Sequence, residues 1–106
     1  MNLKHNINKI HIDLLNNFEE VSILEKSSLE FGNYFEFNIN ESDKVIKAII
    51  SKKDMENNFF NWKYYSNPNN DNSYLVERES TVDSFTEVVK DIFEKNRFDS
   101  EYLKSK

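Results

Sequence analysis

The sequence predicts an α+β fold: a two-layer sandwich with an N-terminal helix, an antiparallel meander sheet of four to five strands and a C-terminal helix, both helices on one sheet face. Three observations predict it. Apolar residues recur at helical spacing near both ends of the chain, they alternate with polar residues between, and the connections are short. Short connections favour antiparallel neighbours, because parallel strands need long crossovers. We expect residues 1–106 to form one domain.

The first helix is expected from Leu3 to about Glu20. Apolar side chains recur there every three or four residues, which places them on one face of a helix, while charged and amide side chains fill the other face. The periodicity changes after Glu20, so we expect the helix to end there. The apolar stripe, with Leu15 beside it, consists of Leu3, Ile7, Ile10, Leu14 and Phe18.

Five segments between the helices have strand character. Val45–Ser51 is apolar on both sides, which is typical of a central strand. In Leu29–Ile39 the apolar side carries Leu29, Phe31, Phe35, Phe37 and Ile39. Gly32 beside Asn33 predicts a bulge or a bend there. The expected strands are Val21–Glu25, Leu29–Ile39, Val45–Ser51, Phe59–Tyr65 and Tyr74–Glu79, joined by a turn at Asn40–Asp43, a connection at Lys52–Asn58 and a loop at Ser66–Asn72.

The second helix is expected directly after the last strand. Ser80-Thr81-Val82-Asp83 resembles a capping box, in which the serine accepts from a backbone amide and the acid three residues later reaches back. We expect Asn96 to end this helix and Asp99 to cap one further turn with Tyr102 and Leu103. Its apolar residues at helical spacing are Val82, Phe85, Val89, Ile92 and Phe93.

The composition excludes several kinds of catalytic site. The chain has no cysteine, so thiolate chemistry and disulfides are absent. Its one glycine, Gly32, rules out a glycine-rich phosphate loop and the Gly-x-Ser-x-Gly nucleophile motif. Glu77 and Glu79 flank Arg78 in the last expected strand, where charged side chains protect an edge from pairing. We therefore expect a protein that is not an enzyme.

Two arrangements were weighed as metal sites. His5 and His11 are six residues apart on one helix, so they point away from each other, unlike the i, i+4 pair of a zinc helix. Asn67, Asn69, Asp71 and Ser73 follow the spacing of a calcium loop, but that pattern needs a glycine at position six and a bidentate acid at position twelve, where this chain has Asn72 and Arg78. We expect no metal and no cofactor.

No apolar run in the chain reaches the length of a membrane-spanning helix, and residues 1–20 lack the pattern of a secretory signal. The absence of cysteine suits a reducing compartment. We expect a soluble, cytoplasmic protein that does not bind membranes.

The face of the sheet without helices is the candidate binding surface. Protein interfaces commonly use tyrosine anchors inside a charged rim. The expected strands place five such side chains on this face, pointing toward solvent: Tyr34, Glu36, Lys47, Lys63 and Tyr65.

The sequence favours a small non-enzymatic domain that binds a protein, most concretely an inhibitor of the toxin-immunity or phage anti-defence type. Residues 27–43 hold four acidic residues and no basic residue, and the whole chain has a net charge of −5. Both features suggest a basic partner. In this hypothesis Glu36 meets the partner's basic site, and Tyr34 and Tyr65 supply buried area.

Three alternatives stay open. One is a single-stranded nucleic-acid-binding domain, in which Lys47 and Lys63 hold phosphates and Tyr65 stacks on a base. A second is an accessory or adaptor subunit, and a third is a homodimer that pairs its outer faces.

Overall fold

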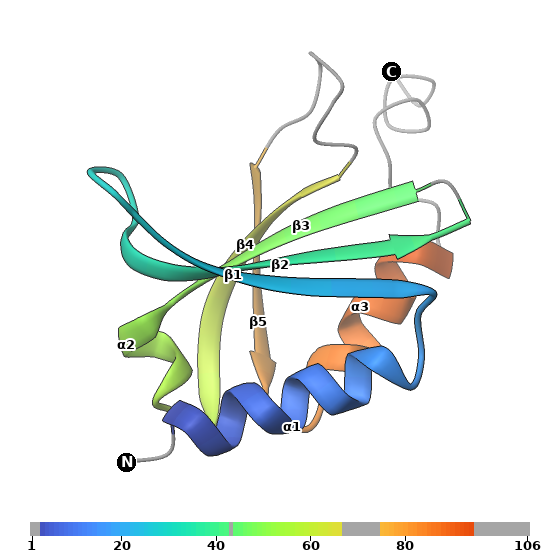
Figure 1. The fold of residues 1–106 in the computed structure, drawn as a ribbon, viewed down its shortest axis with the longest axis horizontal. Helices are drawn as coiled ribbons and strands as arrows, with labels where there is room; N and C mark the ends of the chain where they lie inside the picture. Colours follow the sequence, from blue (N-terminus) through green and yellow to red (C-terminus); the bar gives the residue numbers. More distant parts are fainter. Residues whose placement is uncertain (1–2, 43, 67–74, 95–106) are drawn as a thin grey trace.

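The computed structural model describes residues 3–42, 44–66 and 75–94 (Figure 1). The predicted fold is confirmed: five strands form one antiparallel meander in the order β1-β2-β3-β4-β5, with helices before and after it. The elements are α1 Leu3–Leu15, β1 Glu20–Ser28, β2 Gly32–Glu41, β3 Lys44–Ser51, α2 Lys52–Met55, β4 Phe59–Ser66, β5 Leu75–Thr81 and α3 Phe85–Glu94.

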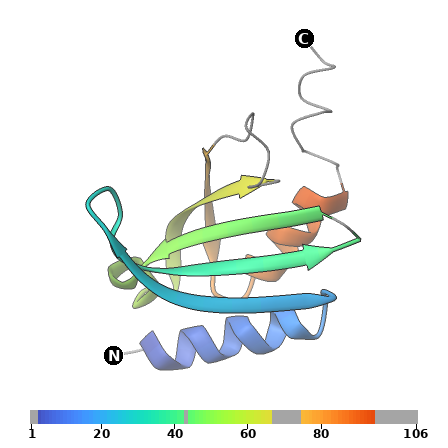
Figure 2. The ribbon, with the colours of Figure 1, turned by 45° about the horizontal axis from the view of Figure 1, so that its top comes forward.

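α1 and α3 lie on the same side of the sheet and enclose the core with it (Figures 1 and 2). Phe85 of α3 is fully buried, and its ring contacts Trp62 at 4.7 Å between ring centroids. Trp62 donates from Nε1 to Ser80 Oγ at 2.8 Å, which satisfies its one polar group. The buried core residues on this side are Ile10, Leu14, Phe18, Phe35, Phe37, Ile39, Ile46, Ala48, Ile50, Met55, Phe60, Trp62, Tyr64, Val82, Phe85, Val89 and Ile92.

The sheet is strongly twisted. Figure 1 shows β1, β2 and β3 running across the view, whereas β5 runs steeply to them. Right-handed twist between neighbouring strands accumulates across five strands to this difference in direction. The helices fill the concave side that the twist creates.

The first helix ends earlier than the sequence predicted, at Leu15 instead of Glu20. The amide side chain of Asn17 donates to the carbonyl of Asp13 at 2.6 Å, and the N–H of Phe18 bonds to the carbonyl of Leu14 at 2.9 Å. These bonds satisfy carbonyls at the helix end. Phe18 stays buried all the same, because the chain turns its ring against Phe93 of α3 at 5.4 Å.

The hairpin between β1 and β2 corrects two further predictions. β1 extends to Ser28, and β2 begins only at Gly32, so Leu29 and Phe31 belong to the turn and not to an apolar strand face. Gly32 has φ 68°, a left-handed conformation that glycine adopts without steric cost. The expected bulge or bend is therefore the end of a turn, and Leu29 at its tip is fully exposed.

The connection predicted at Lys52–Asn58 contains a one-turn helix, α2. Ser51 Oγ accepts from the N–H of Asp54 at 3.0 Å and donates to its carboxylate at 2.9 Å. Ser51 is therefore the N-cap of α2, and its hydroxyl also holds the carboxylate of Asp54. The pattern Ser51-Lys52-Lys53-Asp54 was the sequence signal for it.

The capping box of the last helix lies one residue later than predicted. Thr81 N–H donates to Ser84 Oγ at 2.9 Å, and Ser84 N–H donates to Thr81 Oγ1 at 3.0 Å. Ser80 is buried under Trp62 instead, and Asp83 pairs with Lys9 of α1 at 3.2 Å. Ser66, predicted as the first residue of a loop, belongs to β4 instead. The rest of that predicted loop and the predictions for Tyr74, Asn96 and Asp99 fall on residues 67–74 and 95–106, outside the described residues.

Candidate protein-binding face

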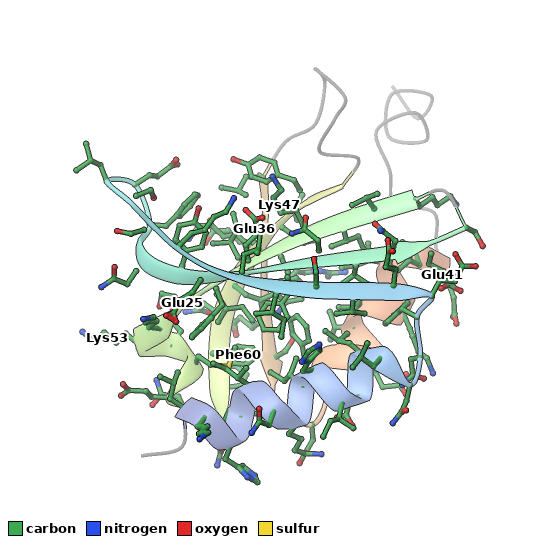
Figure 3. All side chains as sticks on the ribbon, viewed as in Figure 1. Glu25, Glu36, Glu41, Lys47, Lys53 and Phe60 are labelled. Atoms are coloured by element: carbon green, nitrogen blue, oxygen red, sulfur yellow. The ribbon has the colours of Figure 1, made fainter. Side chains whose placement is uncertain are left out.

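The outer face is defined here as the side of the sheet away from α1 and α3. Figure 3 shows Glu36 and Lys47 on this side and Phe60 on the side that faces α1. Side chains point alternately to the two sides of a sheet, so every second residue of a strand belongs to the outer face. The outer-face residues of the three middle strands are Tyr34, Glu36, Asn38, Asn40, Val45, Lys47, Ile49, Ser51, Phe59, Asn61, Lys63 and Tyr65.

The strand register brings four of the five predicted residues together. Lys47 of β3 lies directly opposite Tyr65 of β4. Ile49 of β3 lies between Glu36 of β2 and Lys63 of β4, because it pairs with both. Tyr34 is farther along β2, opposite Ser51 and Lys26.

The prediction that all five side chains point into solvent is wrong for Glu36 and Tyr34, which are 5% and 8% exposed. The ring of Tyr34 packs edge-on against Phe31 from the hairpin turn, with 5.5 Å between the ring centroids. Strand alternation alone cannot reveal this, since the turn that brings Phe31 over the face is a tertiary feature. Lys47, Lys63 and Tyr65 are half-buried and remain accessible.

Glu36 is held by three neighbouring side chains. Lys26 Nζ donates to Glu36 Oε1 at 3.1 Å, and Asn38 Nδ2 donates to Oε2 at 3.0 Å. Lys47 Nζ lies 3.9 Å from Oε1. A buried carboxylate needs such partners, because burial of an unpaired charge is costly.

Burial opposes ionisation of Glu36 most strongly, but the hydrogen bonds from Asn38 and Lys26 and the charges of Lys47 and Lys26 outweigh it, so the pKa of Glu36 is below its ordinary value. Glu36 therefore stays ionised at neutral pH. It acts as an internal anchor for two lysines and does not offer a free carboxylate to a partner.

Lys26 and Asn38 are the site residues that sequence reasoning missed. The position of Lys26 follows from its distance along the chain from the β1–β2 turn, because the two strands pair outward from that turn. In this register Lys26 is opposite Tyr34 and Leu24 is opposite Glu36. A lysine at position 26 is thus a diagonal neighbour of Glu36, within reach of its carboxylate. The sequence alone does not fix this register, because it does not show that the turn ends at Gly32.

A small hollow of about 160 Å³ opens beside Lys63, between the hairpin turn and β3–β4. Phe31 and Ile49 provide apolar groups, and Glu30, Asp54 and Lys63 provide charged groups. This mixture suits one side chain of a docked partner better than a small-molecule substrate, for which pockets are usually larger and more apolar.

Two of the remaining candidate groups share this face. Glu77 and Glu79 are exposed on the outer side of β5, which is an edge strand as predicted, and Glu77 lies directly opposite Lys63. Arg78 lies on the other face, opposite Trp62. His5 is exposed and His11 is half-buried on α1. Among residues 3–42, 44–66 and 75–94, no group of three or more His, Cys, Asp or Glu side chains could hold a metal ion.

Comparisons with protein-family models, with curated proteins and with solved structures find no match. In the part of the chain that the structure describes, each helix is too short or too polar to cross a membrane.

Proposed function

We propose that this chain is a small non-enzymatic domain that binds a partner protein through the outer face of its sheet. The observation that carries the proposal is the arrangement of Lys47, Lys63 and Tyr65 as accessible side chains around a fixed centre, Glu36, on a face that α1 and α3 leave uncovered. Charged and aromatic side chains held by neighbours lose little entropy on binding, which favours affinity.

The chemistry of the face selects its partner. Glu36 is already neutralised by Lys26 and Lys47, so the accessible charges at the centre of the face are the lysine ammonium groups. A partner that places carboxylates against Lys47 and Lys63, with an apolar group over Tyr65, complements them. The expectation that Glu36 itself meets a basic partner does not suit this geometry.

An inhibitor of the toxin-immunity or anti-defence type is the most concrete form of this function. Its support is the small acidic chain, with a net charge of −5, and the absence of any catalytic motif in the sequence. In such a form the net negative charge of the whole chain sets the long-range attraction to a basic partner, while Lys47, Lys63 and Tyr65 make the contacts.

The test is affinity capture from source-cell lysate, after nuclease treatment, with four forms of the full chain. We expect the wild type to retain a stoichiometric protein that Lys63→Glu and Tyr65→Ala variants lose. Lys4→Glu, the same charge reversal at an exposed position of α1, is the matched control and retains it. A partner kept by all variants contradicts the outer face as the binding surface.

A second function is favoured by one observation: Lys47 and Tyr65 face each other directly across β3 and β4, and Lys63 is two residues from Tyr65 on the same side. Two cations beside an aromatic ring is an arrangement that binds single-stranded nucleic acid. Fluorescence anisotropy with a labelled twelve-nucleotide poly-U and poly-dT strand at low salt tests it. Binding that a Lys47→Ala/Lys63→Ala variant weakens, with a flatter salt slope, supports this function. No binding of the wild type at low salt excludes it.

A further inference from the structure

β1 is an open edge of the sheet. It pairs with β2 through nine consecutive residue pairs, from Glu20 opposite Asn40 to Ser28 opposite Gly32, with no bulge. No backbone hydrogen bond within the described ranges joins β1 to any segment except β2. Its other edge therefore presents a row of backbone N–H and C=O groups, which can pair with another extended chain.

The two edges of the sheet differ in how they are protected. Edge strands usually carry charged residues, proline or a bulge that discourage further pairing. β5 follows this rule with Glu77, Arg78 and Glu79 in its centre. β1 carries charged residues at Glu20, Glu25 and Lys26, but the run Val21-Ser22-Ile23-Leu24 between them has no charge and no proline.

Exposed apolar side chains lie on both sides of the β1 edge. Leu24 is 46% exposed on the outer face. On the other side, α1 runs along β1, away from β2, in both Figure 1 and Figure 2. Leu15 of α1 is 51% exposed. Leu15 and Lys9 lie on opposite flanks of the buried apolar stripe of α1. Lys9 pairs with Asp83, just before α3, so the flank that carries Leu15 is the one on the side of the β1 edge.

We propose that an extended segment of a partner protein adds to β1 as a sixth strand of the sheet. The unpaired main-chain groups of β1 select an extended backbone, as in other sheets that accept a peptide strand. Leu24 on one side and Leu15 on the other select apolar side chains on both faces of that segment, because each would cover apolar surface that is now exposed. The bound segment lies above α1 and alongside β1.

A second copy of this chain fits the edge less well than a single strand. A strand needs only the usual spacing of 4.7–4.9 Å from β1. A copy paired through its own β1 would also bring its α1 against this α1, which runs along β1 (Figure 2). This inference does not depend on Lys47, Lys63 or Tyr65, since a Lys63→Glu substitution in β4 leaves the β1 edge intact.

The probe is a phage-displayed library of random twelve-residue peptides, selected on the full-length chain. Peptides that bind are synthesised, and their affinities for the wild type and four variants are measured by fluorescence anisotropy. We expect Leu24→Lys and Leu15→Lys each to weaken binding by about tenfold or more, which corresponds to roughly 1.4 kcal/mol. Leu29→Lys, the same substitution at the exposed hairpin tip, and Lys63→Glu are the controls and bind as the wild type does.

Hydrogen exchange on the complex locates the peptide independently of the variants. Slowed exchange of backbone amides in β1 supports the proposal, since those amides become hydrogen-bonded to the added strand. Selection of no peptide, selected peptides that bind Leu24→Lys and Leu15→Lys as tightly as the wild type, or a dimer in sedimentation equilibrium that protects β1 each overturn it.

Discussion

At the scale of single residues, two buried polar side chains, Glu36 and Asn6, are each held by more than one hydrogen bond. Glu36 is ionised on a sheet face because Lys26, Asn38 and Lys47 surround its carboxylate. Asn6 is buried at 1% exposure and donates to the carbonyl of Met55 at 2.8 Å and to that of Asn57 at 3.3 Å. It thereby ties α1 to the end of α2.

Glu36→Gln is expected to lower the free energy of unfolding by about 1–2 kcal/mol at pH 7, because the two lysines lose their charged partner while staying partly solvated. The folded-state pKa of Glu36 is depressed, so its contribution is complete above the unfolded-state pKa of about 4.3 and is lost as the pH falls through the lower folded-state value. Urea unfolding at pH 7 and at pH 3 measures the difference.

The wild type and Glu36→Gln should therefore differ less at pH 3 than at pH 7. Glu77→Gln, on the exposed part of the same face, is the control and changes stability little at either pH. A deficit of Glu36→Gln that is the same at both pH values would show that the charge of Glu36 does not contribute.

Asn6→Ala is expected to destabilise the fold by about 1–3 kcal/mol, because it leaves the carbonyls of Met55 and Asn57 without their donor in a buried place. Asn8→Ala, at an exposed position of the same helix, removes the same group and should raise stability slightly or leave it unchanged. Chemical denaturation of the two variants compares them. Equal effects would mean that the Asn6 bonds contribute nothing net.

At the scale of elements, short polar motifs decide where helices begin, and a shift of one residue changes which side chains are free. Thr81 and Ser84 cap α3 reciprocally, so Ser80 is free to accept from Trp62 inside the core. Asp83 is left to pair with Lys9 across to α1. The Ser80–Asp83 box and the Thr81–Ser84 box fit the sequence almost equally, and burial of Trp62 decides between them.

Thr81→Val is expected to cost about 0.5–2 kcal/mol, because it removes the acceptor for the N–H of Ser84 while keeping a β-branched residue at the end of β5. Ser84→Ala should cost a similar amount, and the double variant less than the sum, since both belong to one motif. Asp83→Asn should have a smaller effect. Thermal and urea unfolding of the four variants test the motif, and a larger loss in Asp83→Asn would favour the box that the sequence predicted.

At the scale of the whole molecule, one core connects the sheet to both long helices. Trp62, the only tryptophan of the chain, lies in this core and is 2% exposed. Its ring contacts Phe85 of α3 and Tyr64 of β4. With one shared core, no layer keeps its buried surface after the other has separated. Cooperative unfolding follows.

Trp62 fluorescence and far-ultraviolet circular dichroism should therefore report the same urea transition. The emission of Trp62 is expected to shift to longer wavelength at the urea concentration where helix signal is lost, because both depend on the same packing. The midpoint and slope from the two probes are compared. Loss of helix signal before Trp62 becomes exposed would show that the helices separate from an intact sheet.

The sequence by itself determined the order and type of the main elements, because hydrophobic periodicity is a local property: the stripe in α1, the alternation in β2 and β4, and the apolar β3 are readable residue by residue. It also determined which five side chains share the outer face. The tertiary structure alone decided which of them are accessible. Burial of Glu36 and Tyr34 depends on where the β1–β2 turn ends, and that places Lys26 and Phe31 over them. Such contacts join residues through the folded backbone, so no spacing along the chain specifies them.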